Sequence, residues 1–190
     1  TEIYTLSLHD ALPICIAFNG EQMNGIPTTK EELLQAYQSI PWFFDLKPKQ
    51  MERLVSISHL RLIPVGDSLF GEGDRADCVH IVLDGQFQVE MYIPTQGQFN
   101  VFIAETLDVL GWSSLTPVVR QRIATVRAIV PSRVISLDGE PLRKLCDEDH
   151  DIGYVVMRRI ANVVASHFLI TRLQLMNQII EQSKETANHT

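Results

Sequence analysis

The sequence predicts an α+β fold, mainly β, with an antiparallel barrel or sandwich between short N-terminal helices and one long C-terminal helix. Two patterns carry this prediction. Between residues 60 and 138, short β-rich runs alternate with turns containing glycine or aspartate, as is typical of antiparallel sheets. After Asp138 the apolar residues recur at helical spacing, and no proline follows Pro141.

Composition indicates an ordinary folded domain. The chain has 190 residues, of which 45% are hydrophobic and 21% charged, which excludes wholesale disorder. With 16 basic and 23 acidic residues the net charge is −7, so general nucleic-acid binding is disfavoured. No apolar run is long enough for a membrane span. Three widely spaced cysteines favour buried thiols in a reducing, cytoplasmic compartment over a cysteine-held metal site.

The chain divides into a leader, a helical segment, a β-rich segment and a helical end. Residues 1–22 resemble translated sequencing adaptor and lack the basic start of a secretory signal. We therefore expect a non-native, disordered leader before a native start at Met23. Residues 23–59 hold short helices, one beginning at Thr28-Thr29 with acids in its first turn and another at Pro48. Residues 60–138 form the β-rich part, 139–182 the C-terminal helices, and 183–190 a disordered tail.

Each β-rich run has turn residues at its ends. The expected strands are 60–65, 68–70, 78–83, 86–92, 99–104, 124–130 and 133–137. Asp84-Gly85 predicts a hairpin between the third and the fourth of them.

The long helix, capped by Asp149 or Asp151, extends for roughly 45–50 Å and is apolar around most of its circumference. One stripe can pack on the barrel, and the rest needs a partner, for which a second copy is the simplest choice. A fully buried helix in a monomer is the alternative.

Charge is distributed unevenly along the chain. Residues 109–137 contain four arginines and no acid, giving +4 within an acidic protein. An arginine-rich patch without carboxylates favours a small anionic ligand, although solvated charges at a strand edge are the alternative. Gly111 allows close backbone approach, and the serines after it can begin a helix whose free N–H groups suit a phosphate.

Three motifs resemble the cyclic nucleotide-binding domain family, of the catabolite activator protein and protein kinase A regulatory subunit type. Residues 70–77 followed by 80–85 are similar to the early strands of the family. The spacing from Gly111 to Arg122 is similar to that in its phosphate-binding cassette, which would span residues 110–124 here. Residues 122–128 resemble the Arg-x-Ala-x-Val-x-Ala end of that cassette. The resemblance implies a β-roll or jelly-roll barrel, stand-alone and without a helix-turn-helix domain.

The resemblance also implies roles for individual residues. Arg122 would pair with a cyclic phosphate, with Arg120 as an alternative, and the base would lie near Thr171 or Arg172. Backbone N–H groups would complete the phosphate cradle, and Gly111 would allow the sharp turn into the cassette helix. The candidate ligand-binding residues are Gly111, Trp112, Ser113, Ser114, Leu115, Arg120, Arg122, Ile123, Ala124, Thr171 and Arg172.

Two residues depart from the family pattern. Trp112 stands where the family usually has a glutamate that accepts the ribose 2′-hydroxyl, and Ile123 where it often has Ser or Thr. Each lost hydrogen bond costs about 1–3 kcal/mol, which would weaken cyclic AMP binding. Trp112 can compensate by stacking on a base or by filling the sugar site.

The expected function is a non-enzymatic regulatory module that senses a small phosphate-containing ligand, such as cyclic AMP, cyclic GMP or a related cyclic nucleotide, and shifts its C-terminal helix. We expect a homodimer through that helix and no cofactor. Direct DNA binding is not expected, because the residues after Leu175 hold no recognition helix. The alternative is a degenerate domain without a small-molecule ligand that acts in protein interaction or dimerisation. A cupin-type enzyme is a weaker option, since the six histidines lack metal-ligand spacing and no catalytic residue stands out.

Overall fold

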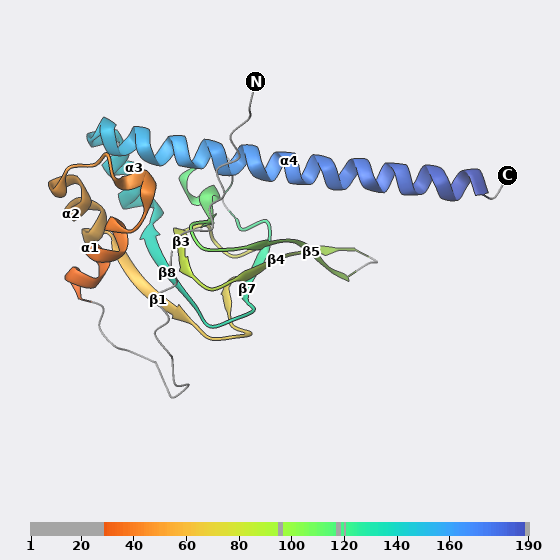
Figure 1. Cartoon of the computed structure of the whole chain (residues 1–190), viewed down its shortest axis with the longest axis horizontal. Helices are drawn as coiled ribbons and strands as arrows, with labels where there is room; N and C mark the ends of the chain where they lie inside the picture. Colours follow the sequence, from red (N-terminus) through yellow and green to blue (C-terminus); the bar gives the residue numbers. More distant parts are fainter. Residues whose placement is uncertain (1–28, 95–96, 117–118, 120, 189–190) are drawn as a thin grey trace, which may run out of the picture.

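The computed structural model describes residues 29–94, 97–116, 119 and 121–188, so the expected leader lies outside the described residues. The short helices α1 (Lys30–Gln38), η1 (Pro41–Phe43) and α2 (Pro48–Ser56) come first, and α3 (Gly139–Glu148) and α4 (His150–Asn188) come last (Figure 1). The strands between them are β1 (Ser58–Ile63), β2 (Ser68–Phe70), β3 (Cys78–Asp84), β4 (Phe87–Ile93), β5 (Gly97–Ala104), β6 (Val109–Leu110), β7 (Thr125–Ala128) and β8 (Ser132–Asp138). A four-residue 3₁₀ helix, η2 (Trp112–Leu115), follows β6.

The strands form two antiparallel sheets, with the orders β1-β8-β3-β6 and β2-β7-β4-β5. This arrangement confirms the predicted β-roll with short helices before it and a long helix after it. All seven predicted strands are present, whereas β6 was not predicted. A strand of two residues is too short to show any alternation in the sequence.

The prediction of a hairpin at Asp84-Gly85 is wrong. β3 pairs with β8 and β6, and β4 pairs with β5 and β7, so the turn carries the chain from one sheet to the other. Gly85 has φ +95°, and a Cβ there would lie 2.7 Å from the Cα of Ser132 at the start of β8. The glycine is therefore needed for close backbone approach, a requirement that a hairpin turn and a crossover turn share.

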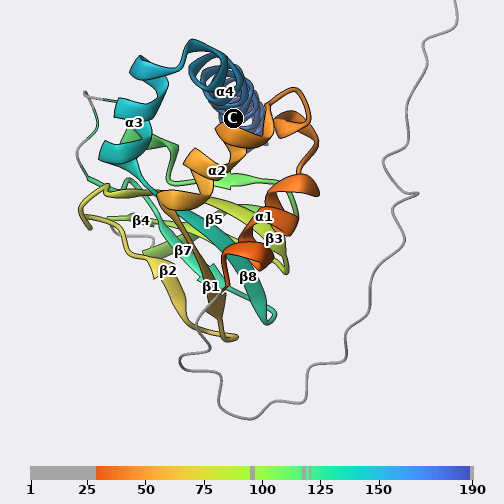
Figure 2. The same ribbon diagram turned by 90° about the vertical axis from the view of Figure 1, so that its left-hand side faces the viewer.

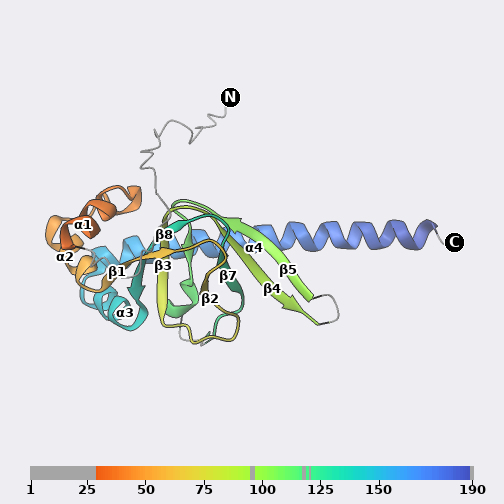
Figure 3. The ribbon, with the colours of Figure 1, turned by 90° about the horizontal axis from the view of Figure 1, so that it is seen from below.

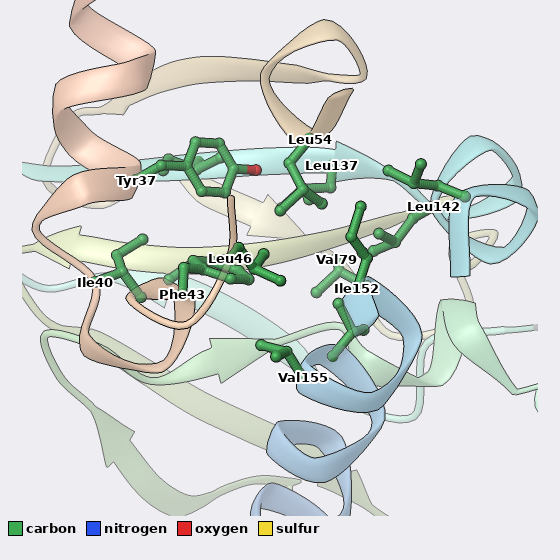
Figure 4. Packing of buried hydrophobic residues seen from close by; sticks show 14 of the residues in the cluster. Tyr37, Ile40, Phe43, Leu46, Leu54, Val79, Leu137, Leu142, Ile152 and Val155 are labelled. Carbon is green, nitrogen blue, oxygen red and sulfur yellow. The ribbon is translucent and has the colours of Figure 1, made fainter. Parts of the chain in front are cut away.

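The first sheet is buried on both faces. One face packs against the helices, where the buried cluster includes Tyr37, Leu54, Val79, Leu137 and Ile152 (Figure 4). The other face packs against the second sheet, through a cluster that joins residues such as Val82 and Val134 to Phe87 and Val126. Figure 2, viewed along α4, shows the short helices in front of the strands. The β-roll thus has a helical layer at one end and a sheet-to-sheet core behind it.

Capping side chains fix where the helices begin. Thr29 Oγ1 accepts from the N–H of Glu32, and the Glu32 carboxylate accepts from the N–H of Thr29, a capping box at α1. At α4, Asp149 Oδ1 accepts from the N–H of Ile152. Both starting points match the predictions from the sequence.

Helix α4 is longer than the sequence suggested. It has 39 residues, about 58 Å at the usual rise, and passes the expected end at residue 182 to reach Asn188. Residues 183–188, predicted as disordered tail, are therefore helical, since they contain no proline or glycine to end the helix. Residues 189–190 lie outside the described part.

The middle of α4 packs on the roll along one stripe. Buried side chains end at Val163, after which His167, Ile170 and Gln174 are half-buried. Gln174 Nε2 donates to the carbonyl of Val101 in β5 at 2.8 Å. In Figures 1 and 3, α4 runs from the helical end along the roll and beyond it. None of the helices in the described residues combines the length and hydropathy needed to cross a membrane.

Arg159 holds α4 to two other parts of the molecule. Its Nη2 donates to the carbonyl of Leu107 at 2.6 Å, and its guanidinium lies 4.2 Å from the ring centre of Trp42 in η1. Leu107 has φ 72°, an uncommon value for a residue with a side chain, in the turn after β5. Arg159 therefore joins the N-terminal helices, this turn and α4.

Candidate functional site

Gly111 turns the chain from β6 into η2. Its φ of 69° lies in the left-handed region that favours glycine, and Ser114 donates both its N–H and its Oγ to the Gly111 carbonyl. A Cβ at position 111 would lie 2.8 Å from the carbonyl oxygen of Cys78 and would clash with the guanidinium of Arg122. The absence of a side chain thus makes room for Arg122.

Arg122 is held in place by its backbone and by its side chain. Its N–H donates to the carbonyl of Asp74 at 2.7 Å, and its carbonyl accepts from Gly73, which joins it to the glycine-rich turn before β3. Nη1 donates to the carbonyl of Gly111 at 2.9 Å and Nη2 to that of Cys78 at 2.5 Å. The guanidinium lies 4.3 Å from the ring centre of Phe70. These contacts fix the plane of the guanidinium.

The charge of Arg122 has no carboxylate partner among the described residues. Only 4% of the residue is exposed, and its Nε is buried without a hydrogen-bond partner. Burial lowers the pKa of Arg122, against a smaller opposite effect of Cys78, Asp77 and Asp74. Because arginine stays protonated in proteins, the site retains a buried positive charge.

A cavity of about 160 Å³ opens beside this guanidinium. Its walls come from the cassette, from the β4–β5 hairpin and from α4. The lining residues are Phe70, Val89, Met91, Val101, Phe102, Leu110, Gly111, Trp112, Ser113, Arg122, Ile123, Ala124, Val126, His167, Ile170 and Thr171. No acidic residue lies among them.

The cavity brings together seven of the residues proposed from the sequence: Gly111, Trp112, Ser113, Arg122, Ile123, Ala124 and Thr171. Ser114 and Leu115 are buried but do not line it, because Ser114 bonds back to Gly111 and Leu115 joins the core beneath the helices. Arg172 is exposed on α4 and does not line it either, since the next residue along a helix points about 100° away. Arg120 lies outside the described residues.

Sequence reasoning missed the hairpin wall of the cavity and found only Thr171 of the helix wall. Phe70 lies in the early strands, outside the cassette, yet its ring packs on the guanidinium of Arg122. Met91, Val101 and Phe102 are ordinary strand residues without any motif. His167 could have been found from Thr171, because residues four positions apart share a helix face, and Ile170 then lies three positions after His167.

Two histidines near the cavity, the buried His80 and the half-buried His167, have lowered pKa values that favour the neutral ring at neutral pH. His80 Nδ1 lies 2.8 Å from Ser136 Oγ on the neighbouring strand, and its ring stacks with Phe70 at 5.7 Å. Burial and then the charge of Arg122 lower the pKa of His80 well below its usual value. Burial likewise lowers the pKa of His167, whose ring centre lies 4.7 Å from that of Phe102. The described residues contain no group of side chains that could hold a metal ion.

We expect His80 to make the protein less stable in mild acid. The folded-state pKa lies below the unfolded value of about 6.5, so below that pH the unfolded chain binds a proton that the folded chain does not. The free energy of unfolding should fall with pH below about 6.5, by up to about 1.4 kcal/mol per pH unit, until the folded pKa is reached. Urea unfolding at a series of pH values measures this slope.

The control for this slope is His80→Asn, which keeps a polar atom near Ser136 but cannot titrate in this range. The variant should show a shallower slope below about pH 6.5, with His167 among the groups that still contribute. Equal slopes in the two proteins would contradict a neutral, buried His80.

Comparisons with known proteins agree with this architecture. The family model for the cyclic nucleotide-binding domain matches residues 60–149. No curated protein matches the chain. A cyclic nucleotide-binding domain from Methylobacillus flagellatus KT is 22% identical, with a TM-score of 0.66 over 78% of this chain and 83% of its own.

Two further structures share the fold. The sensor domain of the transcriptional regulator DNR from Pseudomonas aeruginosa is 16% identical, with a TM-score of 0.61 over 73% of this chain and 93% of its own. The regulatory subunit of a cAMP-independent protein kinase A from Trypanosoma brucei is also 16% identical, with a TM-score of 0.62 over 77% of this chain and 51% of its own. The two sheets, the cassette after β6 and the matched residues together show that this chain contains a domain of the cyclic nucleotide-binding family.

Proposed function

We propose that this chain is a non-enzymatic sensor that binds a small anion through Arg122 and transmits binding through α4. The observation that carries the proposal is the buried guanidinium at the cavity wall, 4% exposed and without a carboxylate partner in the described chain. A buried charge without a counter-charge costs several kcal/mol, which an anionic ligand would offset. The family makes cyclic AMP and cyclic GMP the first ligands to test.

Helix α4 is the proposed output element. His167, Ile170 and Thr171 line the cavity, so a ligand there would touch the helix directly. The same helix is joined to the roll by the hydrogen bonds of Gln174 and Arg159. A ligand that binds one position of α4 better than another would shift the helix in proportion to that difference in affinity.

Isothermal titration with cyclic AMP, cyclic GMP and a cyclic dinucleotide, each at up to millimolar concentration, is the first test. Saturable binding that depends on Arg122 would support the proposal. If neither these ligands nor an aromatic monoanion, 1-naphthaleneacetate, binds, the sensor function is wrong.

We further propose that α4 pairs with α4 of a second copy. Exposed apolar side chains recur seven residues apart: Phe168 with Leu175, Leu169 with Met176, and Leu173 with Ile180. On a helical wheel of about 100° per residue, they lie about 90–150° from the stripe that packs on the roll, on the exposed sides of the helix. A seven-residue apolar repeat is typical of helices that wind around each other in a left-handed coiled coil.

Sedimentation should therefore detect a dimer at micromolar concentration. The double variant Leu173→Glu/Ile180→Glu is expected to be monomeric, because it places like charges in the apolar seam. Asn177→Glu/Gln178→Glu adds the same charge outside the seam and should remain dimeric. A monomeric wild-type protein, or dimerisation that survives the Leu173 and Ile180 changes, would contradict this interface.

The second candidate function is a protein-interaction or dimerisation module without a small ligand. Trp112, which lines the cavity in place of the family's glutamate, favours it, as do the two backbone carbonyls that Arg122 already binds. A dimer that binds no anion would support this function over the sensor.

We propose a reducing, cytoplasmic environment for this chain, because the two cysteines in its described part, Cys78 and Cys146, are free thiols.

A further inference from the structure

The cavity is a mostly apolar chamber with one cation at its end. Hydrocarbon and aromatic side chains from β2, β4, β5, β7 and α4 form most of its wall. Phe70, Phe102 and Trp112 add flat aromatic surface, on which an aromatic ligand can stack. Such a wall favours a ligand whose body is apolar, because each hydroxyl buried there without a partner would cost binding free energy.

Few hydrogen-bonding side chains remain for a polar ligand. Besides Arg122, the described lining offers the hydroxyls of Ser113 and Thr171, the ring of His167 and the indole N–H of Trp112. None of the lining residues is a carboxylate, the group that most readily accepts hydrogen bonds from a pair of sugar hydroxyls. The wall therefore provides little to distinguish a ribose from a ring without hydroxyls.

The positive charge at the cavity is also limited. Among the described residues that line the cavity, Arg122 alone has a permanent charge, because the lowered pKa of His167 favours its neutral ring near pH 7. Two of the five guanidinium N–H groups already donate to the carbonyls of Gly111 and Cys78. One fixed cation with few free donors matches a single negative charge better than the dianion of a phosphate monoester.

We propose that the preferred ligand is a monoanion on a largely apolar, aromatic body, and that ribose hydroxyls contribute little to its recognition. This proposal rests on the proposed anion-sensing function and names the chemical class of its ligand. The acid end would lie at Arg122 and Ser113, and the body would lie between the β4–β5 hairpin and α4.

The test compares ligands that differ in one feature at a time, by isothermal titration. 1-Naphthaleneacetate carries the anion and the aromatic body, its amide lacks the charge, and acetate lacks the body. Cyclic AMP and 2′-deoxy cyclic AMP differ only in the ribose hydroxyl. We expect the naphthalene acid to bind at least about tenfold more tightly than its amide and than cyclic AMP. It should bind at least about 100-fold more tightly than acetate.

Each result decides between specific claims. Tighter binding of cyclic AMP, with a loss of about tenfold or more for the deoxy form, would overturn the ligand class but leave anion sensing intact. Equal binding of the acid and its amide would overturn the role of the charge. No binding of any ligand would overturn the proposed function itself.

A substitution at Trp112 provides an independent check. Trp112→Glu adds the missing carboxylate and should raise the affinity ratio of cyclic AMP to the naphthalene acid by at least about tenfold. Trp112→Phe keeps an aromatic ring and should leave that ratio within about threefold of the wild-type value. An unchanged ratio in Trp112→Glu, with folding verified by circular dichroism, would contradict the proposed position of the ligand.

Discussion

Replacing Arg122 with leucine is expected to abolish measurable binding of anions in the cavity. The leucine removes the permanent charge of Arg122 from the cavity wall, together with its guanidinium N–H donors. Loss of one partner of a buried charge pair costs about 2 kcal/mol or more, so affinity should fall by at least roughly 30-fold. Titration with the tightest-binding anion measures the loss.

The matched control is Arg127→Leu, in the strand that follows Arg122. Arg127 is exposed and donates to the carbonyl of Gly66 at the surface, so affinity should stay within about twofold. Arg122→Lys keeps the charge but loses the forked geometry, and should bind with intermediate affinity. If Arg122→Leu folds and binds as well as the wild type, Arg122 is not the anchor.

Replacing Gly111 with alanine should give the largest loss of stability at the site. The new Cβ would sit at φ 69° and 2.8 Å from the carbonyl oxygen of Cys78 in β3, and it would meet the guanidinium of Arg122. Backbone in a paired strand cannot easily move away, so strain and steric clash both contribute. We expect the free energy of unfolding to fall by about 3 kcal/mol or more, measured by urea denaturation.

Gly73→Ala separates the two causes. Gly73 has φ +85°, but a Cβ there would have nothing within 4 Å, so only the backbone conformation is penalised. The free energy of unfolding of Gly73→Ala should fall by about 1 kcal/mol. Similar losses in the two variants would mean that close packing against Arg122 does not constrain position 111. Gly111→Ala should also weaken anion binding, whereas Gly73→Ala should affect it far less.

The turn at Asp84-Gly85 shows where local patterns stop being informative. Asp-Gly is a pair that favours tight hairpin turns, and the strands on either side of it are as predicted. These two strands nevertheless pair with other strands and not with each other. Which strand becomes a neighbour depends on the packing of both sheets. Turn residues report only that the chain reverses or bends there.

Apart from Thr171, only the cassette side of the candidate site could be predicted from the sequence. The cassette residues are close together in the sequence and carry a recognisable motif, so Gly111 and Arg122 could be named in advance. Met91, Phe102 and His167 reach the same cavity from a hairpin and from a helix far along the chain. No local signal distinguishes Met91 and Phe102 from other apolar strand residues, and His167 could be found only through its helical spacing from Thr171.

The sequence by itself determined the local properties of this protein: the strands, the helix caps, the left-handed glycine before the short helix and the long apolar α4. Each depends on backbone conformation or on spacing within a few residues, which the neighbouring side chains largely set. Only the tertiary structure decided that Arg122 binds two backbone carbonyls beside Phe70, without a carboxylate partner in the described chain. That environment depends on segments brought together by packing of the whole core, which no short stretch of sequence encodes.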